Sequence, residues 1–122
     1  MPWDLDNNRP IYLQLMEKIQ QDIVSGIYKP GDRLPSVREL ALDAAVNPNT
    51  MQKALSELER SKIVHSRRTS GRFITEDEAM LKQLKNELAQ EHIHDFFEKM
   101  NQLGFPKEET LALIQEAIKE ED

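Results

Sequence analysis

Two helix-start signals lie close together in the middle of the chain, and they limit its fold more than any other feature. The first is Ser36 in "SVRE", where Glu39 completes the pattern of a capping box. The second is Asn47–Pro48 in "NPNT", because asparagine is a good N-cap and proline suits the first helical position. The helix that begins at Ser36 must therefore be short, and a tight turn must join it to the next one.

The helix that starts at Pro48 has one apolar face and one polar face. Its apolar stripe consists of Met51, Ala54, Leu55 and Leu58. Its other face carries small polar or basic side chains, namely Asn49, Thr50, Gln52, Lys53 and Ser56. Asparagine and glutamine can pair with adenine edges, and threonine can bond a base or a phosphate. A sharply capped start of this kind predicts a first turn that can approach phosphates and base edges closely.

The segments on either side complete a small domain. Apolar residues at four-residue spacing predict a helix between Pro10 and Gly26. The pairs Ile63–Val64 and Phe73–Ile74 flank "RRTSG" and predict a hairpin, in which Gly71 can take a positive φ. The order of helix, helix, tight turn, helix and hairpin is that of a winged helix-turn-helix, whose second helix of the pair enters the DNA major groove. The predicted fold class is mainly α with a small β-hairpin.

Charge is distributed unevenly along the chain, whose net charge is −6. Residues 1–75 carry 11 Lys/Arg and 9 Asp/Glu, a net charge of +2, whereas residues 76–122 carry 5 Lys and 13 Asp/Glu, a net charge of −8. Five basic residues occur without an acid between positions 60 and 72: Arg60, Lys62, Arg67, Arg68 and Arg72. Because salt screens charges beyond about 10 Å, the acidic tail does not exclude a polyanionic partner for residues 1–75.

From about Glu76 the sequence changes to a long amphipathic pattern, which Gly104 and Pro106 separate from a shorter one. Two helices cannot bury both apolar stripes by themselves, so we expect a homodimer. Residues 1–75 would be the winged helix-turn-helix domain with an N-terminal arm, and residues 76–122 a two-helix dimerisation segment. The predicted interface consists of Leu81, Leu84, Leu88, Ile93, Phe96, Phe97, Met100, Leu111 and Ile114. Such a tail has little room for an enclosed pocket of the usual ~300 Å3 or more, unless the dimer interface supplies one.

Several classes of function find no support in the sequence. The chain has no cysteine, so disulfides and thiolate chemistry are impossible and a reducing compartment is the natural setting. His92 and His94 do not share a helix face, and we expect no metal site. Because no catalytic side-chain set or glycine-rich phosphate loop is found, we expect neither an enzyme nor a cofactor. With no signal peptide or membrane span, a cytoplasmic protein is expected.

The motifs "PIYLQL", "PGDRLPSVRELA" and "ALSELE", at their spacing within residues 9–75, resemble the DNA-binding domain of GntR-type transcription regulators. The "VNPNT" stretch and the short tail resemble the YtrA subfamily, whose C-terminal part is a pair of dimerising helices. The chain departs from the family at Lys62, where glycine is usual, and in "RRTSGRF", where "RxGxGTF" is usual. Gly71 is kept, whereas Thr69 and Arg72 replace a glycine and a threonine.

The resemblance implies DNA contacts by Arg38 and by the first turn of the recognition helix. With the polar helix face and the basic hairpin, the predicted contact set is Arg38, Asn47, Asn49, Thr50, Gln52, Lys53, Arg67, Arg68, Gly71 and Arg72. We expect each subunit to place residues 48–60 in the major groove of double-stranded DNA, with Lys53 and the hairpin arginines on phosphates. The predicted function is a sequence-specific transcriptional regulator, a repressor that acts as a homodimer on an inverted-repeat operator. The residues leave open whether a small-molecule effector exists.

An alternative from another class is a protein-interaction module. In that case the acidic amphipathic tail recruits a partner protein, and the winged helix does not bind DNA. The basic hairpin and the polar first turn of the second helix argue against it. Binding to duplex DNA that weakens steeply with salt would separate the two interpretations.

Overall fold

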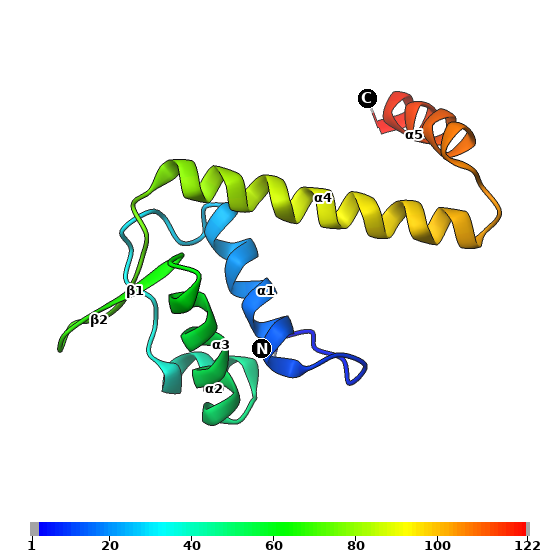
Figure 1. The fold of residues 1–122 in the computed structure, drawn as a ribbon. Coiled ribbons are helices and arrows are strands. Elements are labelled where there is room, and N and C mark those ends of the chain that lie inside the picture. Colours follow the sequence, from blue (N-terminus) through cyan, green and yellow to red (C-terminus); the bar gives the residue numbers. More distant parts are fainter. Residues whose placement is uncertain (1–2, 122) are drawn as a thin grey trace. The chain divides into compact units, whose positions relative to one another are not determined.

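The computed structural model describes residues 3–121 and confirms the predicted fold class: five helices and one two-stranded antiparallel hairpin (Figure 1). In chain order the elements are α1 (Ile11–Val24), α2 (Val37–Ala44), α3 (Pro48–Arg60), β1 (Val64–Arg67), β2 (Gly71–Ile74), α4 (Glu78–Gln102) and α5 (Lys107–Glu121). Among the described residues no helix is long and apolar enough to cross a membrane.

Both predicted helix starts are present. The Ser36 hydroxyl accepts a hydrogen bond from the Glu39 amide at 3.1 Å, and the Glu39 carboxylate accepts one from the Ser36 amide at 3.2 Å. These two bonds are the capping box that opens α2. Asn47 caps α3, with Pro48 at the start of the helix. Between the two helices, Ala45 takes a left-handed conformation (φ 59°), and only residues 45–47 separate the end of α2 from the start of α3.

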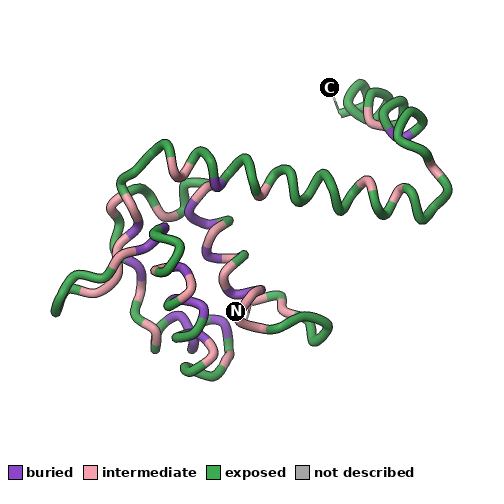
Figure 2. Tube along the Cα trace, viewed as in Figure 1, coloured by how far each residue is buried: buried purple, intermediate pink, exposed green. Residues whose placement is uncertain are grey.

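The core of the first domain lies between its helices. α3 packs against both α1 and α2. Residues that are fully buried there include Leu15, Ile19, Met51, Leu55 and Leu58. Figure 2 shows buried positions repeating along α1, α2 and α3, whereas most of α4 and α5 is exposed. The apolar stripe predicted for α3 is therefore its core face, and the polar side chains of that helix remain on the surface.

The wing is a hairpin with a third segment along one edge. In the hairpin, β1 pairs with β2 in antiparallel register from Val64 opposite Ile74 to Arg67 opposite Gly71. The chain before α2 then pairs with the free edge of β2: Leu34 N donates to Arg72 O at 2.8 Å, and Ile74 N donates to Asp32 O at 2.8 Å. No local sequence pattern predicted this third segment, which connects the start of the helix-turn-helix to the wing.

The N-terminal arm is held by one buried side chain. Gln14 in α1 is only 7% exposed, and its amide accepts from Asp6 N at 2.9 Å. The same amide donates to Asp6 O at 2.8 Å and to Arg9 O at 3.0 Å. Trp3 Nε1 in the arm donates to Asp43 Oδ2 at 2.9 Å. The arm is therefore fastened to α1 and α2 by specific hydrogen bonds.

The chain divides into two compact units, Met1–Lys85 and Asn86–Asp122. The division falls inside α4, some residues after the boundary predicted at residues 75 and 76. Leu84, in the α4 turns that belong to the first unit, is buried at 9% exposure. In the second unit the break predicted at Gly104 and Pro106 is present: Gly104 has φ 95°, and α5 begins at Lys107.

Candidate nucleic-acid interface

The first turn of α3 presents small polar side chains on a rigid start. Asn47 Oδ1 accepts from Asn49 N at 2.8 Å, so the Asn47 side-chain oxygen serves the cap. Asn49 is exposed and Thr50 is half-buried, and neither side chain has a hydrogen bond among the described residues. The cap thus leaves the side chains of Asn49 and Thr50 available to an external partner.

Further along α3, two predicted contact residues have internal partners. Gln52 Nε2 donates to Ser56 Oγ at 3.2 Å on the exposed face. Lys53 Nζ lies 4.0 Å from the centre of the Tyr12 ring in α1, a cation–π contact. Because both groups are exposed, these weak contacts orient the side chains without removing them from the surface.

Arg38 lies on the exposed side of α2, one residue before the capping glutamate. Glu39 is occupied by the capping box and Asp43 accepts from Trp3, so the acids nearest to Arg38 in sequence have other partners. Among residues 3–121 Arg38 has no hydrogen bond or ion pair. Its guanidinium is therefore available to a phosphate or a base.

The arginines of the wing are not equivalent. Arg68 is exposed at the turn. The guanidinium of Arg67 lies over the Phe73 ring, 4.4 Å from its centre. Arg72 is mostly buried and forms an ion pair with Glu59 of α3, whose same carboxylate oxygen accepts from Ser66 Oγ at 2.9 Å. The sequence has no acid between positions 60 and 72, but the fold places Glu59 beside the wing, where its carboxylate offsets the charge of Arg72.

Arg33 is a wing residue that sequence reasoning missed. Its Nε donates to the Ser70 carbonyl at 2.8 Å, and a Cβ on Gly71 would lie only 2.9 Å from that Nε. Gly71 has φ 106°, so the predicted positive φ is confirmed, and the missing side chain also makes room for Arg33. The signal available in the sequence was a basic residue within "PGDRLPS", but nothing local indicated contact with the wing turn.

Two positions where this chain departs from the usual family glycine have left-handed backbones. Lys62, just after α3, has φ 70°, and Thr69, in the wing turn, has φ 49°. L-residues with a side chain pay a conformational cost in this region, typically about 1–2 kcal/mol. Lys62 and Thr69 therefore adopt a backbone conformation that glycine would take at a lower cost.

Exposed cations of the proposed interface come from four places in the first unit. They are Arg33 before α2, Arg38 in α2, Lys53 in α3, and Arg67 and Arg68 in the wing. Within the described part of the chain no group of three His, Cys, Asp or Glu residues could hold a metal ion. A surface with several exposed guanidinium and ammonium groups and small amide and hydroxyl side chains can bind phosphates through charge and base edges through hydrogen bonds.

Comparison with known proteins gives a family for this arrangement. Residues 11–74 match the family described as "Bacterial regulatory proteins, gntR family". The transcriptional regulator YhcF of Bacillus subtilis is 45% identical over 109 residues, which cover 89% of this chain and 90% of YhcF. The transcriptional repressor YtrA of the same organism is 46% identical over 74 residues, which cover 61% of this chain and 57% of YtrA.

Solved structures agree with this assignment. A GntR family transcriptional regulator from Listeria monocytogenes superposes with a TM-score of 0.83 at 40% identity, covering 92% of this chain and 98% of the other. The DNA-binding domain of AraR, solved in complex with an operator, superposes with a TM-score of 0.54 at 26% identity, covering 62% of this chain and 92% of that one. The family and these relatives are transcription regulators, which agrees with the expectation that the chain is not an enzyme.

Proposed function

The chain belongs to the gntR family of bacterial regulatory proteins and is a DNA-binding transcriptional regulator, and we propose that it is a repressor that acts as a homodimer on an inverted-repeat operator. The observation that carries the proposal is the pairing of an available polar first turn in α3 with exposed cations around it. The repressor assignment is supported by the similarity to YtrA, which is named a transcriptional repressor.

Within the interface we propose a division of roles. Asn49 and Thr50 read base edges, because their side chains are small, polar and free of internal partners. Asn47 and Pro48 fix the start of α3 against the DNA, since the Asn47 oxygen is already used by the cap. Gln52 remains a candidate for a base or sugar contact from the exposed face of α3.

The proposed phosphate contacts are Arg38, Lys53, Arg67 and Arg68 of the original set, joined by Arg33. Gly71 contributes by leaving room for Arg33 under the wing turn. Arg72 is proposed to act mainly as a link between the wing and α3, because Glu59 already offsets its charge. Phosphate contacts of this kind supply affinity and orientation, whereas the first turn supplies sequence choice.

Exposed apolar side chains in α4 and α5 support the homodimer. Ile93 is 54% exposed, Phe96 41%, Leu103 71% and Leu111 53%. Leu113 and Ile118 are also exposed and extend the predicted interface. Its remaining predicted members have less surface to offer: Leu84 is buried, and Leu81, Leu88, Phe97, Met100 and Ile114 are half-buried. An isologous contact between two copies would cover this surface and present two recognition helices to one operator.

The test begins with genomic DNA fragments that the purified protein retains, from which the operator is defined. Fluorescence anisotropy then measures binding to the full operator, to a half-site and to random duplex over a range of salt concentrations. We expect a steep loss of affinity with salt, tighter binding to the full operator than to a half-site, and lower transcription from the bound promoter when the protein is present. Absence of DNA binding at low salt, or full-operator affinity equal to half-site affinity, would contradict the proposal.

A further inference from the structure

One carboxylate of the recognition helix bonds both strands of the wing. Glu59, in the last turn of α3, accepts hydrogen bonds at a single oxygen, Oε1, from Ser66 Oγ at 2.9 Å and from Arg72 Nε. Ser66 in β1 and Arg72 in β2 are direct partners in the register of the hairpin, next to the pair Arg67 and Gly71. Glu59 therefore connects one residue pair of the wing to the helix that carries the proposed base contacts.

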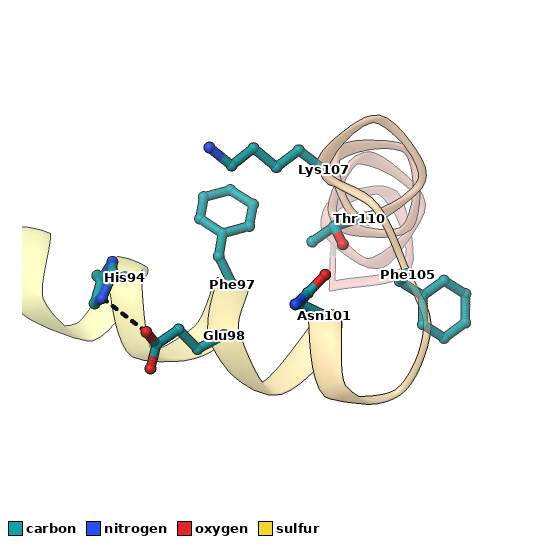
Figure 3. Close-up of a pocket in the computed structure, with 7 residues that line it drawn as sticks. All are labelled: His94, Phe97, Glu98, Asn101, Phe105, Lys107 and Thr110. Carbon is teal, nitrogen blue, oxygen red and sulfur yellow. Dashed lines mark ion pairs between the residues drawn. The ribbon is translucent and has the colours of Figure 1, made fainter.

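The ion pair between Glu59 and Arg72 differs from one formed on a single exposed helix. His94 and Glu98 lie four residues apart in α4, and their side chains are 71% and 63% exposed (Figure 3). Water and salt screen such a pair, which changes the charge of that surface little. Glu59 and Arg72 come from different elements, and their side chains are only 31% and 21% exposed. Their charges are screened less, so the carboxylate masks the positive charge of Arg72 effectively.

The pairing decides which arginines the wing presents to DNA. Arg67 and Arg68 are exposed near the turn, whereas Arg72 is engaged by Glu59 on the side of α3. A guanidinium that is already neutralised by a carboxylate must leave it before it can replace a counterion on a phosphate. Phosphate contacts attract DNA of any sequence. An arginine that is withheld from phosphates therefore lowers the affinity that the protein has for DNA without the correct bases.

From this geometry we propose that Glu59 is a specificity-determining residue, which withholds Arg72 from DNA phosphates and so lowers the affinity for random duplex more than that for the operator. On the operator, the base contacts of Asn49 and Thr50 fix the position of the domain, and the wing meets a fixed set of phosphates. On random duplex no base contact fixes that position, so a released Arg72 can pair with whichever phosphate lies nearest. The inference rests on the proposed contact between the wing and phosphates, and it adds a residue that acts through Arg72.

Glu59→Gln tests the proposal on the full chain, because glutamine keeps the length of the side chain and removes its charge. Fluorescence anisotropy measures binding to random duplex and to the operator over a range of salt concentrations. We expect the salt slope on random duplex to steepen by about one unit, and the affinity for random duplex to rise about eightfold at ~0.1 M salt, the gain from one additional phosphate contact. The affinity for the operator should rise less, so the ratio of the two affinities should fall.

Two further variants show whether the effect passes through Arg72. The double variant Glu59→Gln/Arg72→Gln should have the wild-type slope again, because the released guanidinium is then missing. A purely structural role of Glu59 would not steepen the slope in the first place. Glu57→Gln is the matched charge control on α3, since Glu57 pairs with Arg60, whose side chain is already 77% exposed. We expect its slope to stay near the wild-type value.

Thermal unfolding checks that each variant folds, and Glu59→Ala, which removes the whole carboxylate, should steepen the slope as Glu59→Gln does. An unchanged slope in both Glu59 variants, an equal rise in affinity on the two duplexes, or a matching change in Glu57→Gln would overturn the proposal. Arg68→Ala separates this failure from a failure of the proposed wing contact. If Arg68→Ala flattens the slope and Glu59→Gln leaves it unchanged, only the role of Glu59 is wrong. If neither variant changes the slope, the wing does not contact phosphates and both proposals are wrong.

Discussion

The two units of this chain use their apolar residues in opposite ways. In Met1–Lys85, large apolar side chains such as Leu15, Met51 and Ile74 are fully buried. In Asn86–Asp122, Phe96 and Leu103 remain 41% and 71% exposed, and Thr110 is the only buried residue in the described part of that unit. The first unit closes its own core and turns polar and cationic groups outward. The second has apolar surface left over, so we expect it to be completed by another molecule of this chain.

A substitution at Phe96 tests most directly whether the exposed apolar surface of the second unit is a dimer interface. Phe96→Asp places a charge in the exposed apolar surface and should give a monomer whose residues 9–75 still fold. Because two linked winged helices gain through effective concentration, we expect affinity for a full operator to fall by about 100-fold or more, towards that of a half-site. Light scattering reports the mass, and anisotropy the affinity. Gln90→Asp, which adds the same charge at an exposed polar position, is the control. A dimeric Phe96→Asp variant would contradict the assignment of this surface.

Substitutions in the first turn of α3 should affect recognition of the DNA sequence and leave the dimer intact. Asn49→Ala or Thr50→Ala should cost about 1–3 kcal/mol of binding free energy on the cognate operator and little on random duplex, because these side chains are proposed to read base edges. Anisotropy with both duplexes measures the difference. Asn86→Ala, which removes an exposed asparagine from α4, should change neither value. Equal losses on the two duplexes would reassign Asn49 and Thr50 to backbone positioning.

Arginine substitutions in and beside the wing should differ in their effect on DNA binding, because these arginines have different partners. Arg68→Ala and Arg33→Ala should each weaken binding to operator and random DNA alike, and each should reduce the salt slope by about one unit. Arg72→Ala should leave the slope nearly unchanged, because the Arg72 guanidinium is paired with Glu59. The slopes come from anisotropy titrations at several salt concentrations. A slope that falls for Arg72→Ala and not for Arg33→Ala would reverse the proposed roles.

A local change in the first unit should act on its folding and not on DNA contacts. Ser36→Ala removes the hydroxyl of the capping box, and we expect a loss of about 1 kcal/mol in the free energy of unfolding. Chemical denaturation measures it, with Ser36→Thr as the variant that keeps a capping hydroxyl. An unchanged midpoint for Ser36→Ala would show that this cap contributes nothing to stability.

Lys62→Gly should have the smallest effect, and it should raise the free energy of unfolding. Lys62 has φ 70°, so Lys62→Gly relieves a left-handed conformation, although glycine also loses more entropy on folding. We expect a net stabilisation of about 0.5 kcal/mol, measured in the same denaturation experiment. Ser61→Gly is the control, because Ser61 has φ −77° and glycine gains nothing there. Destabilisation by Lys62→Gly would mean that the Lys62 side chain makes a contact worth more than the backbone strain.

Much of the first unit followed from the sequence alone. The capping box at Ser36, the proline-led start of α3 and the positive φ of Gly71 were all predicted and are present. These features depend on residues within a few positions of each other, where backbone geometry restricts which side chains can meet. The apolar stripe of α3 followed for the same reason, because helical spacing alone puts its members on one face.

Contacts between segments far apart in the chain depend on the tertiary structure. Arg72 meets Glu59 and Arg33 meets Ser70 because β2 pairs with its neighbours in one particular register, which no local pattern specifies. The angle at which α5 leaves α4 likewise depends on the backbone of four turn residues, so the open hollow beside Thr110 could not be read from an amphipathic pattern (Figure 3). The sequence alone predicted where α2 and α3 begin and which face of α3 is apolar. Packing then decided which cations remain available, because a charge is neutralised by whichever acid the fold brings beside it.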